Sequence, residues 1–506
     1  MRLSFQATLT GVVFVAGVGT LATEIAASRL LAPYFGNSTI VWANVIGLTL
    51  ASLSVGYWLG GRLADRYPTP RALGLIVAAA ACLVAVATLL ARPILDFSVE
   101  GLDRVSAGAA IGSFFGVLIL FVPPVTLMGM VAPFAIRLAI QDVESAGTVS
   151  GRLYAVSTVG SLLGTFLAAL VAIPAIGTQR TLLAAAALIG ASGAVLLGRR
   201  WTLLAAGLAA LLLIPPGAVK GQSGVIFEDE SRYQFIQVVE DEGVRRLYLD
   251  EGLATHSVWR EDDVLTGGVW DTYVAVVDLL GRQPERVAML GNAAGTAARA
   301  YERFYPGAEV DGVELDPAVS DAGRRYFGMG EIETLSVHDA DARAFLRRTD
   351  ETYDVIIVDA YRPPYVPFYL ATKEFFELVR KRLRPGGIVA LNVATTPDNH
   401  DLADNIGGTL ATVLPRAFAW HPLRFNQIVI GQNGEPTGQE QPAPAAVNPL
   451  VADLRANLRP IRPSGDPWTD DRAPVEWITD RMIVEFAAGG GRFEEDPLPT
   501  APDGES

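Results

Sequence analysis

The first 216 residues alternate between long apolar runs and short polar breaks. Crossing a bilayer takes about 20 apolar residues. Seven runs approach or exceed that length: 7–30, 40–61, 72–92, 107–130, 152–174, 179–198 and 201–216. One soluble domain cannot bury seven such runs, so the pattern predicts a multi-pass membrane domain. Pro123 and Pro124 predict a kink in the fourth run, and Gly160 and Gly164 permit close contact between helices.

From Val225 onward the pattern changes to short strands separated by helix-like stretches. Residues 230–240 and 246–250 flank a polar turn and predict a β-hairpin. Three later apolar strands end in small or acidic residues: 287–295 (VAMLGNAAG), 310–316 (VDGVELD) and 353–360 (YDVIIVDA). Ligands bind at the carboxyl ends of strands in a parallel α/β sheet, so we expect these strand ends to meet in one crevice.

These patterns divide the chain into four segments. We expect a membrane domain of about seven helices (1–219), a small β subdomain (220–265), an α/β domain (266–480) and a disordered acidic tail (481–506). The first segment has no clear cleavage site after its first apolar run, so that run is interpreted as a membrane helix rather than a signal peptide. The expected location is the cell membrane.

Charge and cysteine content exclude several functions. The net charge is −14, and residues 1–219 carry 12 arginines, no lysine and 7 acids. The negative charge therefore belongs to the second half, which would repel nucleic-acid phosphates. A single cysteine permits neither a disulfide framework nor a zinc site built on cysteine pairs, and the four histidines are scattered, so we expect no metal site.

The placement of arginine predicts the orientation of the membrane domain. The loops after the second, fourth and sixth runs are rich in arginine, which favours a cytoplasmic N-terminus. Seven crossings would put the α/β domain outside the cytoplasm, and six or eight would put it inside. The short seventh run and the kinked fourth run leave both counts open.

Two features of the membrane half carry candidate chemistry. Glu24 lies in the first run, where a carboxylate is costly and by default functional; an ion pair with Arg29 is the alternative. Residues 60–66 (GGRLADR) resemble the loop between the second and third helices of major-facilitator transporters, where Arg and Asp brace helix ends. An ordinary positively charged loop is the alternative there.

The strand ends of the second half supply the candidate site residues. Gly291 and Gly295 follow the first strand and let a nucleoside approach the backbone. Glu314 ends the next strand, where an acid takes two ribose hydroxyls. Asp341 follows the run 335–337 and would accept a hydrogen bond from an adenine amino group, or simply cap a helix. Asp359 would hold or deprotonate an amine nucleophile.

Together these residues resemble the spermidine synthase (polyamine aminopropyltransferase) family, most closely its members fused to an N-terminal multi-helix membrane domain. The resemblance runs from Glu230 to Glu476. It implies a Rossmann-like α/β fold of the S-adenosylmethionine methyltransferase type with a small β-hairpin subdomain. It also implies transfer of an aminopropyl or related alkyl group from decarboxylated S-adenosylmethionine, or S-adenosylmethionine, to an amine, with no tightly bound cofactor.

The resemblance assigns roles residue by residue. Asp359 matches the catalytic acid. The nucleoside would contact Gln234, Gly291, Gly295, Glu314 and Asp341. The acceptor would contact Tyr233, His256, Tyr361 and Arg362. The soluble relatives self-associate through their β-domain, so the resemblance also makes self-association of this chain an expectation.

Among the departures from the family pattern, two concern recognition of the acceptor and the aminopropyl amine. Ala294 stands where the family has the acid that holds the aminopropyl amine, and Arg362 stands where a second acid helps to bind the diamine. Two like charges about 4 Å apart at a surface-like dielectric cost about 4 kcal/mol, so Arg362 would repel a diammonium. A small amine bearing a carboxylate or phosphate, or a lipid-linked acceptor in the membrane, fits better. A non-catalytic transporter or sensor is the alternative function.

Overall fold

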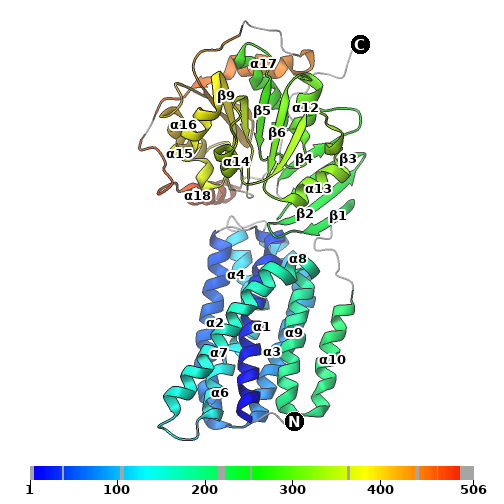
Figure 1. The fold of residues 1–506 in the computed structure, drawn as a ribbon, viewed down its shortest axis with the longest axis vertical. Helices are drawn as coiled ribbons and strands as arrows, with labels where there is room; N and C mark the ends of the chain where they lie inside the picture. Colours follow the sequence, from blue (N-terminus) through cyan, green and yellow to red (C-terminus); the bar gives the residue numbers. More distant parts are fainter. Residues whose placement is uncertain are drawn as a thin grey trace. The chain divides into compact units, whose positions relative to one another are not determined.

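The computed structural model describes residues 5–36, 39–102, 108–214, 223–250, 254–361, 365–438, 444–463 and 465–490. They form two compact units, which Figure 1 draws as ribbons. The helical unit comprises Met1–Gly221 together with Glu230–Phe235, and the α/β unit comprises Gln222–Asp229 and Ile236–Ser506.

The helical unit is built from long apolar helices. Its helices are α1 (Phe5–Phe35), α2 (Thr39–Arg66), α3 (Pro70–Leu102), α4 (Gly108–Leu120), α5 (Val122–Gly129), α6 (Val131–Ala139), α7 (Ala146–Leu167), the π-helix η1 (Ala168–Ala172), α8 (Ile173–Ile176), α9 (Thr178–Leu197) and α10 (Thr202–Ala210). Within the described ranges, six helical stretches are long and apolar enough to cross a membrane. Large apolar side chains such as Leu50, Trp58 and Leu170 are more than half exposed, which is compatible with contact to lipid.

The fourth and seventh predicted runs differ from the helices that form. The fourth run breaks at Phe121, and the next helix has proline in its first turn, so the predicted kink is confirmed. The stretch long enough to cross is Val122–Ala139 rather than 107–130. The seventh run forms only α10 with the short 3-10 turns η2 (Arg199–Trp201) and η3 (Leu211–Leu213) beside it, and α10 alone is too short to cross.

Glycines allow the helices of this unit to pack closely. A Cβ atom added to Gly160 would lie 2.3 Å from the Phe14 carbonyl oxygen, and one added to Gly164 would lie 2.2 Å from that of Val18. Both distances are far below van der Waals contact, so only glycine lets α1 and α7 approach this closely. The predicted role of these small residues is confirmed.

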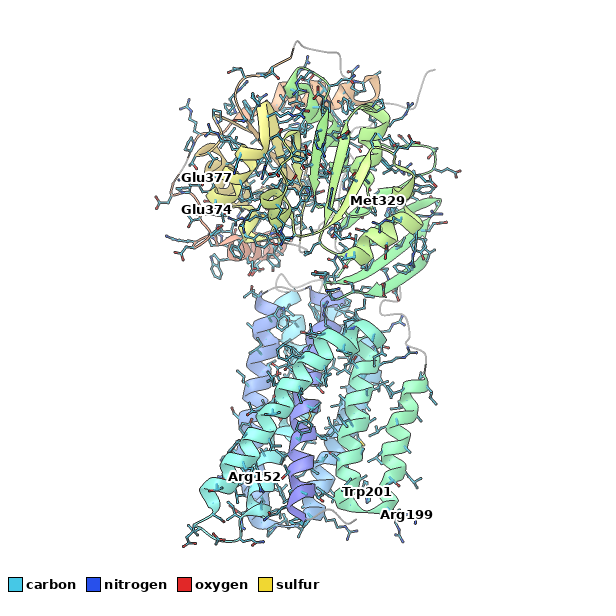
Figure 2. All side chains as sticks on the ribbon, viewed as in Figure 1. Arg152, Arg199, Trp201, Met329, Glu374 and Glu377 are labelled. Carbon is cyan, nitrogen blue, oxygen red and sulfur yellow. The ribbon has the colours of Figure 1, made fainter. Side chains whose placement is uncertain are left out.

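Arginines gather at one end of the helical unit. Figure 2 shows Arg152 at the start of α7 and Arg199 after α9 at the same end. Asp65, near the end of α2, accepts a hydrogen bond of 3.0 Å from Nε of Arg137 in α6, and the Arg62 guanidinium stacks over Trp58 at 3.8 Å. Asp65 therefore joins the end of α2 to α6, and the resemblance of residues 60–66 to transporter loops stays a prediction.

The α/β unit contains two sheets. The smaller has the order β1-β2-β3-β4, formed by β1 (Val225–Glu230), β2 (Phe235–Asp241), β3 (Val244–Leu249) and β4 (Thr255–Trp259). The predicted hairpin is β2–β3, whose antiparallel register runs from Ile236↔Leu249 to Asp241↔Val244. Glu242 and Gly243 at its tip both have positive φ, 49° and 79°, which suits a tight turn between twisted strands.

The larger sheet has the order β12-β10-β11-β9-β8-β5-β6-β7. Its strands are β5 (Arg286–Leu290), β6 (Glu309–Glu314), β7 (Leu335–Asp339), β8 (Tyr353–Val358), β9 (Leu383–Ala394), β10 (Arg416–Leu423), β11 (Asn426–Gln432) and β12 (Arg459–Pro460). Strands β5 to β9 are parallel to one another. Strand β11 is antiparallel to both β9 and β10.

Helices and 3-10 turns connect these strands and cover both faces of the larger sheet (Figure 1). The helices are α11 (Val269–Ala275), α12 (Thr296–Phe304), α13 (Pro317–Tyr326), α14 (Ala342–Arg348), α15 (Lys373–Arg382), α16 (Asp401–Ala411), α17 (Asn448–Asn457) and α18 (Val475–Ala488). Alternate residues of β5 belong to different cores, Val287 and Met289 to one and Ala288 and Leu290 to the other. The Rossmann-like fold of methyltransferase type is confirmed.

The C-terminal boundary predicted from composition lies too early. Helix α18 runs through residues 481–488, which the sequence assigns to a disordered tail. Val475, Thr479 and Met482 are buried at helical spacing, so the apolar face of α18 holds these residues on the α/β core. Residues 491–506 lie outside the described part of the chain.

Candidate active site

Three of the predicted acids meet at one edge of the larger sheet. Strands β8, β5, β6 and β7 are adjacent and parallel, so their carboxyl ends share an edge. Glu314 is the last residue of β6, Asp359 directly follows β8, and Asp341 follows β7 after one residue. The topology therefore brings the three acids to the place where this fold binds ligands.

Backbone hydrogen bonds tie the loops at this edge to one another. Asp359 N donates to the Leu290 carbonyl at 2.8 Å, and Ala340 N donates to the Glu314 carbonyl at 2.8 Å. The loop after β5 lies between them, because Gly291 N donates to the Val313 carbonyl at 2.9 Å. The sheet and the residues that directly follow its strands thus fix the positions of the three acids.

Glu314 is a buried carboxyl held by backbone groups. It is 9% exposed and accepts hydrogen bonds from Ala293 N at 3.0 Å and Asp316 N at 3.1 Å. Burial raises the pKa of Glu314 to about 7, against the effect of these N–H donors. An ionised carboxylate has about four acceptor positions, so acceptor capacity beyond these backbone groups remains for a ligand with hydroxyls, such as a ribose.

The loop after β5 uses its N–H groups on the protein itself. Gly291 N and Asn292 N donate to the Val313 carbonyl, and Gly295 N donates to that of Asn292. Ala293 N donates to Glu314, and Ala294 N donates to Ser257 Oγ at 3.0 Å. A phosphate-binding loop presents its N–H groups to the ligand. This loop instead favours a nucleoside recognised without phosphate contacts.

Gly291 is required for a close approach between two loops. Its φ is 95°, and an added Cβ would lie 2.3 Å from the Asp359 carbonyl oxygen. We expect Gly291→Ala to displace the Asp359 loop and destabilise the chain by about 2 kcal/mol or more. The melting temperature of the purified full-length chain should fall by roughly 4–8 °C. Gly307→Ala, where an added Cβ meets nothing within 4 Å, should leave it unchanged; equal shifts in both variants would contradict the packing argument.

Gly295 and Asp341 act at helix starts. Gly295 has φ 87° and precedes α12, and an added Cβ would lie 2.8 Å from Cγ of Met329. Asp341 caps α14 by accepting from Ala344 N at 2.9 Å, and its other oxygen accepts from Tyr369 Oη at 2.9 Å. The capping role of Asp341 is confirmed, and its contact with an adenine stays a prediction.

Asp359 sits in a polar cluster around the end of β9. Its Oδ1 accepts a hydrogen bond from Nδ2 of Asn392 at 3.0 Å. Burial raises the pKa of Asp359, and the Asn392 amide and the Tyr273 hydroxyl beside it oppose that rise. Tyr361 Oη donates to the Asn392 carbonyl at 3.0 Å and accepts from Ala394 N at 2.8 Å. Tyr361 is therefore anchored to β9, and its contact with an acceptor stays a prediction.

Asn392 is a site residue that sequence reasoning missed. Its Oδ1 accepts from Nδ2 of Asn426 at 2.9 Å, which fixes the amide so that its Nδ2 faces Asp359. The available signal is the single polar residue inside the apolar run of 388–393. A buried amide in a central strand requires a partner, and Asp359 is that partner.

The remaining predicted contacts have different environments. His256 on β4 is partly exposed, but its Nε2 atom is buried and has no hydrogen-bond partner among the described residues, and burial lowers the pKa of the ring to about 4. The imidazole is therefore neutral. It lies next in sequence to Ser257, whose hydroxyl binds the loop after β5.

Tyr233 and Gln234 belong to the segment grouped with the helical unit, so their roles stay predictions. Arg362 lies outside the described residues.

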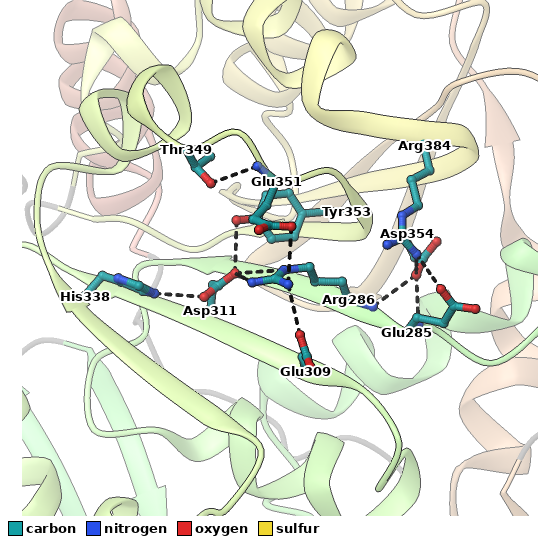
Figure 3. A network of polar contacts seen from close by, with 10 residues as sticks. All are labelled: Glu285, Arg286, Glu309, Asp311, His338, Thr349, Glu351, Tyr353, Asp354 and Arg384. Atoms are coloured by element: carbon teal, nitrogen blue, oxygen red, sulfur yellow. Dashed lines mark hydrogen bonds and ion pairs between the residues drawn. The ribbon is translucent and has the colours of Figure 1, made fainter.

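A second polar network lies at the opposite, amino-terminal edge of the same strands (Figure 3). Asp311 accepts from Tyr353 Oη at 3.1 Å, contacts His338 Nε2 at 2.8 Å and pairs with Arg286. Asp354 accepts from Glu285 N at 2.8 Å, from Arg286 N at 3.0 Å and from Arg384 at 3.0 Å, and it also pairs with Arg282. This network joins the starts of β5, β6 and β8 and lies away from the crevice.

Asp354 should be a major contributor to stability. Burial acts against its ionisation, but the Arg282 guanidinium and two backbone N–H groups hold the pKa of Asp354 below its ordinary value. Asp354→Ala leaves these groups unpaired, so we expect a loss of about 3 kcal/mol and a melting temperature lower by roughly 6–12 °C. A lowered pKa means that the contribution is present above the unfolded-state pKa and is lost as pH falls through the folded one.

The difference between the wild type and Asp354→Ala should therefore shrink in acid. Asp321→Ala removes a carboxylate that pairs with Arg324 on an exposed helix surface, and such pairs contribute roughly 0–1 kcal/mol. Melting both variants across the acidic range checks the assignment. A pH-independent loss in Asp354→Ala would show that its charge is not what stabilises the sheet.

Comparison with known proteins identifies the α/β unit. Residues 271–424 match the spermine/spermidine synthase domain. A probable polyamine aminopropyl transferase from Bifidobacterium longum is 29% identical over 292 residues, covering 53% of this chain and 65% of that protein. A polyamine aminopropyltransferase from Vibrio vulnificus is 32% identical over 196 residues, covering 37% of this chain and 65% of that protein.

Solved structures include a probable spermidine synthase from Corynebacterium glutamicum, with a TM-score of 0.38 and 19% identity over 56% of this chain and 100% of that one. The chain spans slightly less than two thirds of the two curated relatives named above. The family match covers the strand ends that carry Glu314, Asp341 and Asp359. Residues 271–424 of the α/β unit thus match the spermine/spermidine synthase domain, and the unit is similar to the polyamine aminopropyltransferases.

Proposed function

We propose that the α/β unit binds an S-adenosyl-type nucleoside and transfers its aminopropyl or related alkyl group to an amine. The observation that carries the proposal is the meeting of Glu314, Asp341 and Asp359 at one sheet edge, inside the segment that matches the spermine/spermidine synthase domain. The donor would be decarboxylated S-adenosylmethionine or S-adenosylmethionine, acting as a co-substrate.

Each acid has one task in this proposal. Glu314 accepts the two ribose hydroxyls with its free acceptor positions, and Asp341 lies where the adenine edge would reach. Asp359 holds the acceptor amine and takes its proton, while the Asn392 amide keeps the carboxylate oriented. The amine nitrogen attacks the carbon next to the sulfonium. The carbon–sulfur bond breaks, its electron pair stays on sulfur to give a neutral thioether, and the proton moves to Asp359.

The acceptor proposed here is not a free diamine. Ala294 is 1% exposed and packs in the core between the small sheet and α13, so no carboxylate holds an amine from that position. The neutral amide of Asn392 contacts Asp359, and behind it the neutral amide of Asn426 contacts Asn392. An amine that carries an anionic group, either small or linked to a lipid, suits this composition and the arginine at position 362.

The second candidate function is a membrane protein that binds a nucleoside without chemistry, as a transporter or sensor. The replacement of the family's acid by the buried Ala294 favours it. The side of the membrane separates the two candidates, because an S-adenosyl donor is a cytoplasmic compound. The six long apolar helices make a multi-pass membrane location the natural setting for either function.

A topology reporter fused after Ser506 tests the enzymatic proposal. We expect a cytoplasmic reporter such as a fluorescent protein to be active and an exported phosphatase to be inactive. A control fusion after Arg200, which follows the sixth long helix, reports whether the remaining residues add a crossing. Activity of the phosphatase alone in the Ser506 fusion would overturn donor-dependent transfer and leave the sensor or transporter function.

A further inference from the structure

The first membrane helix carries a carboxylate with no counter-ion. Glu24 is the 20th of the 31 residues of α1, about 28 Å from one end and about 16 Å from the other at 1.5 Å per residue. A hydrocarbon layer of about 30 Å centred on this helix includes it. Throughout the described ranges Glu24 is partly buried and has neither an ion pair nor a hydrogen bond.

The expected partner of this carboxylate is engaged elsewhere. The sequence offers an ion pair with Arg29 as the simple explanation of Glu24. The Arg29 guanidinium donates instead to the backbone carbonyl of Arg232. The predicted ion pair between Glu24 and Arg29 is therefore wrong. An isolated carboxylate in an apolar layer is costly, and it requires a proton or a cation to neutralise it.

Hydroxyl groups flank Glu24 on the same helix face. Thr20 and Ser28 lie four residues before and after it, which is the spacing of one helix face. Both are buried, at 5% and 4% exposure. Each donates its hydroxyl hydrogen to the backbone of α1, Thr20 to the Ala16 carbonyl and Ser28 to that of Ile25. Each oxygen keeps lone pairs with which it can accept a further hydrogen bond.

A third buried hydroxyl, that of Thr23, lies beside this face. Thr23 is 0% exposed, and its Oγ1 has no hydrogen bond within the part of the chain that the structure describes. Buried hydroxyls are nearly always paired. An unpaired one next to an unpaired carboxylate indicates that polar atoms of a ligand complete this part of the helical unit.

The helix facing Glu24 is irregular at the same level. Helices α1 and α7 run parallel, with Phe14 against Gly160 and Val18 against Gly164. Glu24 lies six residues after Val18, and six residues after Gly164 the chain is in the π-helix η1. Glu24 is therefore level with η1, which packs against α1. Pro174 has no N–H for a regular turn, and Ile173 N bonds the carbonyl five residues back. Single π-turns inside helices concentrate at functional sites.

We propose that Glu24 and Thr20 form a binding site for a protonated primary amine inside the helical unit. The carboxylate supplies the counter-charge. Side chains on a helix lean toward its N-terminus, so Glu24 reaches toward Thr20, whose hydroxyl oxygen accepts one further N–H donor of the ammonium group. A metal cation of this charge would need more oxygen ligands than this face provides. The site does not depend on the function proposed for the α/β unit.

Equilibrium dialysis of the full-length purified chain with radiolabelled propylamine tests this site. We expect saturable binding that Glu24→Gln weakens at least tenfold, while Glu144→Gln, in the exposed loop before α7, leaves it unchanged. Thr20→Val should weaken it about threefold to tenfold, as the loss of one hydrogen bond to a charged group does, whereas Ser28→Ala, one turn away on the other side of Glu24, should leave it unchanged. Excess tetramethylammonium, which has no N–H donor, should not compete.

Three outcomes would overturn the proposal: no saturable binding, full competition by tetramethylammonium, or binding that survives in Glu24→Gln. In the last case the amine binds elsewhere, and the α/β unit becomes its location. Melting temperatures exclude a folding defect, because Glu24→Gln removes a buried unpaired charge and should leave stability unchanged or higher.

Discussion

Replacing Asp359 with asparagine should reduce the turnover number for alkyl transfer by about 100-fold to 10,000-fold. Asparagine keeps the size of the side chain but cannot take the proton of the amine. The measurement is product formation from decarboxylated S-adenosylmethionine under single-turnover conditions, with a panel of amines as acceptors. Donor binding should change little, because Asp359 contacts the acceptor rather than the nucleoside in this proposal.

Asp350→Asn is the matched control. Asp350 is exposed, in the loop before β8, while Asp359 follows the other end of the same strand, so both changes remove one carboxylate near one strand. Full activity in Asp350→Asn with loss in Asp359→Asn assigns the effect to the proton acceptor. An Asp359→Asn protein with wild-type turnover would remove Asp359 from the mechanism.

Glu314→Gln should weaken donor binding by about tenfold to 100-fold, because hydrogen bonds to a charged acceptor contribute about 1.5–3 kcal/mol. The neutral amide also puts an NH2 group where Glu314 accepts from two backbone N–H groups. Glu309→Gln is the control, since Glu309 begins the same strand at its exposed, amino-terminal end. Both are measured by calorimetric titration with the donor.

Donor affinity should also depend on pH through the same group. The pKa of Glu314 is raised to about 7, and the ionised form is the better acceptor for ribose hydroxyls. Affinity should therefore rise with pH and become level above pH 8, with binding at pH 6 about tenfold weaker than at pH 8. Glu314→Gln should show no such change. An identical pH profile in both proteins would exclude Glu314 as the titrating group.

The strand ends were predictable because their signals are local. An apolar strand that ends in an acid, as at Val313-Glu314 and Val358-Asp359, is visible in the sequence, and parallel topology then places those ends together. The capping role of Asp341 was equally visible. The partnership of Asn392 with Asp359 was not, because it depends on which strand lies next to β8, and no local pattern states that β9 takes this position.

The contribution of Asp354 to stability and the boundaries of the domains were harder to predict, because they too depend on contacts between distant segments. Asp354 is one of several acids in the α/β half, and only the strand order shows that it collects donors from the starts of β5 and β9. The number of membrane crossings depends on whether short helices such as α10 pack as partial spans, which hydropathy alone does not determine. The acidic composition after residue 480 concealed the apolar face of α18.

The most direct test of the central claim is calorimetric titration of the full-length, detergent-purified chain with decarboxylated S-adenosylmethionine at pH 8. We expect saturable binding with one donor per chain, weakened in Glu314→Gln and retained in Asp359→Asn and Glu309→Gln. Binding of the same strength in Glu314→Gln, or no saturable binding of this donor or of S-adenosylmethionine to the folded wild-type chain, would contradict the assignment of the crevice to an S-adenosyl donor.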